Sequence, residues 1–168
     1  MGIGGWLRDR PRFLEAAYGL THTIVDVLDP LLSKIGYTRT ERFLKAPEEW
    51  LKGVVFDCRM CGQCILHSTG MTCPMTCPKT LRNGPCGGVR AGGYCEVKPE
   101  MRCIWVEAFE RSQHMNEYGK EIRWLQPPVN RQLEGRSAWI TMLTGEDTDF
   151  PVGWHDRKSL EDLAGFDD

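Results

Sequence analysis

Eight cysteines lie within a short stretch of this chain, and they constrain its fold more than any other feature. All of them lie between residues 58 and 103 of the 168-residue sequence: Cys58, Cys61, Cys64, Cys73, Cys77, Cys86, Cys95 and Cys103. The N-terminus MGIGGWLRDRPRF has charges but no uninterrupted apolar stretch, so it does not read as a secretory signal. We therefore expect a cytoplasmic protein, in which clustered cysteines bind metal more often than they form disulfides.

The cysteine-rich segment has few residues from which to build an apolar core. Residues 58–103 hold seven glycines, four prolines and a single aromatic residue, Tyr94. Ordering a backbone costs about 1–2 kcal/mol per residue, and burying so few large apolar side chains offsets little of that cost. Metal–thiolate bonds can supply the folding free energy of such a segment. The composition therefore predicts that this segment folds around bound metal.

The first three cysteines follow the spacing Cys58-x-x-Cys61-x-x-Cys64, which lets one short loop wrap a face of a cubane cluster. The cluster-binding motif of bacterial ferredoxins begins with the same spacing and continues to a cysteine that precedes proline. The analogous element here is Cys73-Pro-Met-Thr-Cys77-Pro, further along the chain. We expect the first three cysteines to share one site, completed by a distant cysteine.

Eight thiolates suit two four-coordinate sites, and three kinds of occupancy remain open. These are two 4Fe–4S clusters, zinc in one or two sites, and one site of each kind. A zinc ribbon requires two separated Cys-x-x-Cys pairs, whereas three cysteines follow one another here, so iron–sulfur is favoured. His67 is a possible substitute zinc ligand, although a solvated loop histidine is the simpler interpretation. No cysteine stands apart from the others as a nucleophile would, and we expect no catalytic residue in the chain.

Charge within the segment agrees with metal-bound thiolates. Six basic residues and two acidic ones between 58 and 103 leave an excess of four positive charges, which can offset the negative charge of such sites. Three polar residues lie between the cysteines, where they could tune a cluster, contact a partner or satisfy a turn: Lys79, Arg82 and Asn83.

The residues before the cysteines are predicted to be mostly helical. In residues 1–57, apolar side chains recur at helical spacing, with Pro11 near the start of the pattern. Pro30 should kink or split this helix, and Gly36 should end it. A second, shorter helix is expected over 38–51. His22, within the first apolar pattern, is expected to be a core histidine.

The residues after the cysteines predict one more helix and a tail. The helix should begin at Pro99 and run to about Tyr118, where Gly119 stops it. We therefore expect a mostly α fold with an irregular cysteine-rich metal-binding core, N-terminal helices, cluster-binding loops, one following helix and an extended C-terminal tail. Three regions are expected: an N-terminal helical region (1–57), a metal-binding core with its helix (58–118) and an extended, partner-binding C-terminal region (119–168).

Three stretches of the sequence resemble a known family. They are CRMCGQCILHSTGMTCPMTCPKTLRNGPCGG, GYCEVKPEMRCIWVEAFER and PPVNRQLEGRSAWITMLTG. Together they are similar to the cysteine-rich C-terminal family of methylenetetrahydrofolate reductase. In bacteria, this unit occurs as a separate small subunit or fused to a flavin-binding reductase barrel.

The resemblance implies a role in one-carbon metabolism. The family's reductase transfers a hydride from reduced flavin to methylenetetrahydrofolate, and its FMN or FAD and its folate bind to a (β/α)8 barrel. This chain is too short to form such a barrel, so the resemblance implies the accessory subunit alone, with metal sites that relay electrons to the partner's flavin.

Two other functions stay open. The metal could be zinc that braces the complex without a redox role, since the family has often been described as zinc-binding. The chain could also be the iron–sulfur partner of another folate-linked methyl-transfer system. Neither nucleic acid nor a membrane is expected as a partner, because the formal net charge is −2 and no long apolar run is present.

Overall fold

The computed structural model describes residues 3–149, which contain helices and no β-strand. The α-helices are α1 (Ile3–Arg8), α2 (Pro11–Ile35), α3 (Tyr37–Phe56), α4 (Ile104–Ser112) and α5 (Ala138–Thr144). Short 3-10 helices are η1 (His67–Thr69), η2 (Pro74–Thr76), η3 (Ala91–Gly93), η4 (Gly119–Arg123) and η5 (Arg131–Leu133). The predicted mostly helical fold is confirmed. None of the described helices has both the length and the apolar character needed to cross a membrane.

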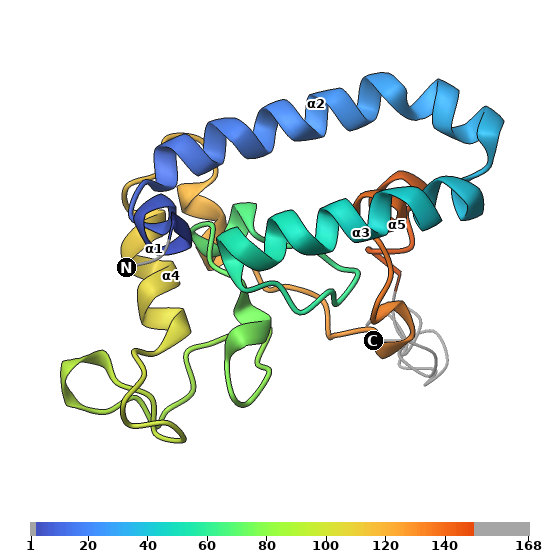
Figure 1. The fold of residues 1–168 in the computed structure, drawn as a ribbon. Coiled ribbons are helices and arrows are strands. Elements are labelled where there is room, and N and C mark those ends of the chain that lie inside the picture. Colours follow the sequence, from blue (N-terminus) through green and yellow to red (C-terminus); the bar gives the residue numbers. More distant parts are fainter. Residues whose placement is uncertain (1–2, 150–168) are drawn as a thin grey trace, which may run out of the picture.

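Helices α2 and α3 form a long hairpin; the first of the cysteine-rich loops lie beneath α3, and the later ones, around η3, extend away from the hairpin (Figure 1). The hairpin turns at Gly36, whose φ of 96° favours glycine and whose N–H donates to Leu32 O at 3.0 Å. The predicted end at Gly36 is confirmed. Pro30 does not split the helix, because α2 continues through it, and a kink at Pro30 stays a prediction. Proline removes a single N–H donor, and the helix continues past it although the neighbouring side chains of Leu28 and Leu31 are exposed. Helix α3 is longer than the predicted 38–51.

Helix α4 is shorter than predicted at both ends. The residues before it turn back on themselves: Cys95 N–H donates to Met101 O at 2.9 Å, and Cys103 is still extended. The chain leaves the helix after Ser112, and Gly119 begins η4 instead of following a helix. Tertiary hydrogen bonds therefore override the helical pattern of 99–118.

The C-terminal region is folded as far as the structure describes it. Residues 119–149 contain η4, η5 and α5, and α5 lies beside the α2–α3 hairpin (Figure 1). Ser137 caps α5, with its hydroxyl accepting from the N–H of Ile140. Residues 150–168 of the predicted tail lie outside the described part, and the division into three regions stays a prediction.

The apolar core joins the helical hairpin to the first half of the cysteine-rich segment. Its buried members are Leu14, Val55, Leu66, Met71, Cys73, Met75 and Met115. Nearly every residue from 60 to 75 is buried or half-buried, so the prediction that this segment buries little apolar surface is wrong for its first half. Methionine side chains fill irregular spaces between loops, which explains how a core forms here without regular periodicity.

Glu15 of α2 anchors the turn that follows α4. Its buried carboxylate accepts hydrogen bonds from the backbone N–H groups of Asn116, Glu117 and Tyr118 at 2.8, 2.8 and 2.9 Å. Burial alone would raise the pKa of Glu15, but these hydrogen bonds and the nearby Arg12 lower the pKa below its usual 4.5. The carboxylate therefore stabilises the fold in its charged form.

We expect Glu15→Gln to lower the free energy of unfolding near neutral pH by about 1–3 kcal/mol, because buried N–H groups lose a charged acceptor. A carboxyl with a depressed folded pKa stabilises the protein above the unfolded value of 4.5, and this contribution is lost as the pH falls through the folded pKa. Urea unfolding of both proteins, measured from neutral pH downward, should therefore show the difference shrinking in acid. A difference independent of pH would contradict the role of the charge.

Candidate metal centres

Four of the thiols lie together beside the apolar core: Cys58, Cys61, Cys64 and Cys73, the first cysteine group. Cys58 and Cys73 hydrogen-bond to each other, and Cys64 lies within electrostatic reach of Cys58 and Cys61. Cys73 belongs to the core, and Cys61 and Cys64 pack against it. The neighbour of the predicted trio in the structure is thus Cys73, the next cysteine along the chain. Completion of the site by a distant cysteine stays a prediction.

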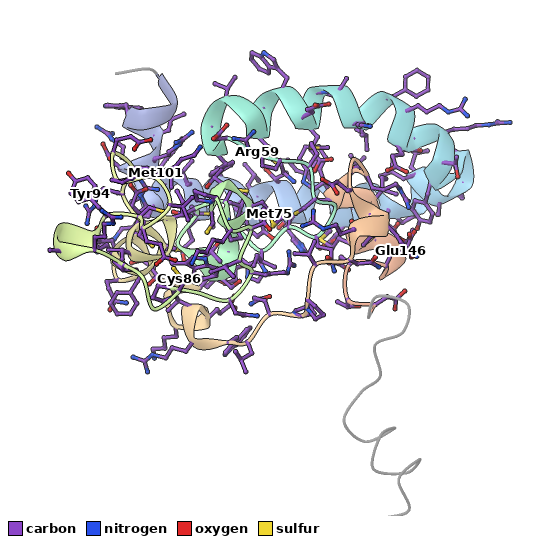
Figure 2. The ribbon with its side chains drawn as sticks, turned by 90° about the horizontal axis from the view of Figure 1, so that it is seen from below. Arg59, Met75, Cys86, Tyr94, Met101 and Glu146 are labelled. Carbon is purple, nitrogen blue, oxygen red and sulfur yellow. The ribbon has the colours of Figure 1, made fainter. Side chains whose placement is uncertain are left out.

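The other four thiols line one narrow cavity: Cys77, Cys86, Cys95 and Cys103, the second cysteine group. The turn before α4 folds two of them together, since Cys103 N–H donates to Gly93 O at 2.8 Å. Cys86 lies among the loops on the side of the molecule that carries Tyr94 and Met101, far from Glu146 (Figure 2). This group therefore belongs to the loops, whereas the first group belongs to the core.

Each cysteine is a free thiol, and the two groups use each of the eight once. Among residues 3–149, no three His, Cys, Asp or Glu side chains stand at the mutual distances of a bound ion. The thiols of each group are neighbours that a metal would have to draw together. Sets of four thiolates are suitable ligands for both zinc and iron–sulfur clusters.

The thiols of the first group differ in how readily they ionise. The hydrogen bond with Cys73 lowers the pKa of Cys58 to about 6, and the nearby Lys52 acts in the same direction. The same hydrogen bond and burial raise the pKa of Cys73, and burial raises the pKa of Cys64. Metals bind the thiolate form, which Cys58 reaches more readily than Cys64 or Cys73.

Lys52 of α3 brings a buried positive charge to the first cysteine group. Its Nζ lies 2.6 Å from Oε1 of Glu48 and 5.0 Å from the ring centroid of Trp139. Burial alone would lower the pKa of Lys52, but the charges of Cys64 and Glu48 outweigh it and raise the pKa. Lys52 was not predicted from the sequence, because a Glu-x-x-x-Lys pair on a helix ordinarily indicates a solvated surface.

Arg82 brings a second buried charge from the loop before Cys86. Its Nη1 donates to Gln63 O at 2.9 Å, and its side chain lies beside Cys61. Its buried Nε has no acceptor among the described residues. A buried donor of this kind normally has a partner, and a metal-bound thiolate or cluster sulfide would serve as one. The residues present therefore fit a metal centre at this position.

His67 and His22 do not join either cysteine group. His67 is partly buried, with Nδ1 2.5 Å from Oε2 of Glu121 and the rings of Tyr18 and Tyr118 nearby. It is therefore not the solvated loop residue that the sequence suggested. His22 is also not a core residue, because its side chain is 43% exposed and pairs with Asp26.

Gly62 lets the loop between Cys61 and Cys64 pass close to the C-terminal region. Its φ is +72°, and a side chain there would overlap the carbonyl of Leu133. Its own carbonyl accepts from the Thr141 hydroxyl at 2.5 Å.

We expect Gly62→Ala to lower the free energy of unfolding by about 1–3 kcal/mol, through backbone strain and displacement of Leu133. Gly87→Ala is the matched control, since that glycine also adjoins a cysteine but has open space around it. Thermal unfolding and metal content of both variants test this expectation. Equal behaviour of the two would show that the close approach at Gly62 has no role.

These observations define a small helical protein whose eight free thiols form two groups of four. A protein-family model described as "Methylene-tetrahydrofolate reductase C terminal" matches residues 37–132, and the chain belongs to this family. The matched region includes α3, both cysteine groups and α4. The family suspected from the sequence is thereby confirmed. Neither the curated proteins nor the solved structures contain a match.

Proposed function

We propose that this chain is an accessory iron–sulfur subunit of a cytoplasmic, flavin-dependent methylenetetrahydrofolate reductase, with a 4Fe–4S cluster in each cysteine group. Membership of the family supports the link to the reductase. The observation that carries the proposal is the division of eight thiols into two complete sets of four. Such clusters supply one-electron transfer, and the flavin, FMN or FAD, would belong to the (β/α)8 partner subunit.

The chain's own residues would hold and shield the clusters. Cys58, whose pKa is lowered by the hydrogen bond with Cys73, would start the first site, and Cys73 would close it from within the apolar core. Core residues such as Leu66 and Met71 keep water from this site. The second site depends on the turn that brings Cys95 and Cys103 together.

Zinc in both groups is the second candidate, and the position of the first group favours it. A zinc ion held by four thiolates inside the core would brace α2, α3 and the loops, as structural zinc does in other small domains. In that case the subunit would assemble or stabilise the reductase without carrying electrons.

Absorption and electron paramagnetic resonance (EPR) spectroscopy of the anaerobically purified chain separate the two candidates. The iron–sulfur proposal predicts a brown protein whose broad visible absorption bleaches on reduction, with a paramagnetic signal appearing at the same time. A colourless protein that carries zinc would contradict the electron relay and support the bracing role. Co-purification with a protein other than a flavin barrel would favour a different folate-linked system.

We further propose that one face of α2 contacts the reductase subunit. Apolar residues recur along it at helical spacing and remain exposed: Leu20, Ile24, Val27, Leu28, Leu31 and Ile35. An exposed apolar stripe of this kind is typical of a protein–protein interface. The family links the chain to a reductase, which makes that subunit the expected occupant.

The double variant Val27→Glu/Leu31→Glu tests this contact. It should abolish co-purification with the reductase subunit while leaving the helical circular dichroism of the free chain unchanged. Lys34→Glu, a charge change at another exposed position of α2, is the control and should retain binding. Unimpaired co-purification of the double variant would contradict the proposed face.

A further inference from the structure

The first cysteine group lies between two buried cations. Lys52 and Arg82 are only 7% and 6% exposed, and they come from separate parts of the chain. Lys52 acts on Cys64 and Cys58, while Arg82 lies beside Cys61 and within electrostatic reach of Cys64. Every cysteine in the Cys58-x-x-Cys61-x-x-Cys64 motif therefore has a buried positive charge nearby.

Each cation also has a carboxylate within electrostatic reach, and Glu48 pairs directly with Lys52 at 2.6 Å. Glu48 accepts from the Ser137 hydroxyl at 2.5 Å and the Ala138 N–H at 3.2 Å, so it is shared with the start of α5. Its influence on Cys58 is weaker than that of Lys52. Among the described residues, Asp147 acts on Arg82 but forms no ion pair with it, and the guanidinium donates to the Gln63 carbonyl. Arg82 therefore leaves a buried positive charge beside the first group that no described carboxylate pairs with.

The second cysteine group has a different charge environment. Lys79 and Glu96 line its cavity and form an ion pair with each other. Oε1 of Glu96 lies 3.8 Å from Sγ of Cys86, so a carboxylate faces this group directly. Both members of the pair are about one-third exposed, and water screens their charges. The field at the second group is therefore close to neutral or negative.

We infer that the first cysteine group holds the cluster with the higher reduction potential, and that the unpaired buried charge of Arg82 raises it. This inference rests on the proposed iron–sulfur function. A one-electron reduction adds one negative charge to the cluster, and a buried cation stabilises that charge more than a screened surface pair does. An electron that enters either site should therefore come to rest in the first one.

A potentiometric titration of the anaerobic, fully loaded chain, followed by EPR, tests the inference. The wild type should give two reduction steps, and Cys86→Ser should remove the step at lower potential. Arg82→Gln should change the oxidised-to-reduced ratio of the higher-potential cluster at least tenfold, which corresponds to about 59 mV for a one-electron couple. Arg82→Lys, which keeps the charge, should restore most of the shift.

Two further variants act as controls. Glu96→Gln should raise only the lower potential, because it removes the carboxylate that faces Cys86. Arg39→Gln, at an exposed position in the first turn of α3, should change neither reduction potential. If both reduction potentials are the same in the wild type and in Arg82→Gln, the inference is overturned and the proposed function still stands. A colourless zinc protein would overturn both.

Discussion

Replacing Cys73 by serine should destabilise the whole molecule, whereas the same change at Cys86 should leave the helical core folded. Cys73 is buried in the apolar core with Leu66 and Met75, and its thiol forms a hydrogen bond with the thiol of Cys58. In the proposed function Cys73 is a metal ligand, and its loss would remove a structural site from the core, so we expect a loss of at least about 3 kcal/mol in the free energy of unfolding. Cys86 lies in loops that the core does not need, and its loss should cost less than about 1 kcal/mol.

Denaturant unfolding followed by far-ultraviolet circular dichroism measures this difference, and metal analysis accompanies it. Each variant should lose the metal of one group only, because the two sets of thiols share no member. Equal destabilisation by the two substitutions would contradict the placement of the first group in the core. Loss of all metal from either variant would contradict the division into two sites.

Removing the carboxylate of Glu48 should produce the other large effect. Glu48 is fully buried, binds Lys52 and accepts hydrogen bonds from two groups at the start of α5. Glu48→Ala leaves a buried ammonium without its partner, which typically costs about 3–5 kcal/mol. Urea unfolding at neutral pH measures this loss.

Two further variants serve as controls for Glu48→Ala. Glu49→Ala, at the exposed neighbouring position, should change the free energy of unfolding by less than about 0.5 kcal/mol. The double variant Glu48→Ala/Lys52→Met should recover part of the loss, since no unpaired charge remains. A double variant as unstable as the sum of both single changes would contradict the buried pair.

The helical hairpin could be predicted from sequence because its signals are local. Apolar spacing before Gly36 and the glycine itself define the first helix and its end. The bounds of α4 could not be predicted from the sequence, because the turn that follows the helix depends on Glu15. The Glu15 carboxylate accepts from the N–H of Asn116, which is 101 residues away in the sequence. A hydrogen bond of that range leaves no mark in the local pattern.

The candidate site could also be predicted from the sequence only in part. The spacing of Cys58, Cys61 and Cys64 was enough to predict that they lie near one another, since a short loop keeps its own residues together. Their neighbour Cys73 and the cation Lys52 could not be predicted, because the core and α3 position them. The burial of residues 60–75 also depends on packing against α2 and α3, which composition alone does not reveal.

The eight thiols should form two four-ligand metal sites, and all of the proposed function depends on them. Measuring iron, acid-labile sulfide and zinc in the anaerobically purified chain tests these sites most directly. We expect about eight iron and about eight sulfide atoms per chain, since each 4Fe–4S cluster holds four of each. About two zinc ions without iron would keep the two sites and contradict the electron relay. A chain that folds without metal, with all eight thiols open to titration, would contradict both sites.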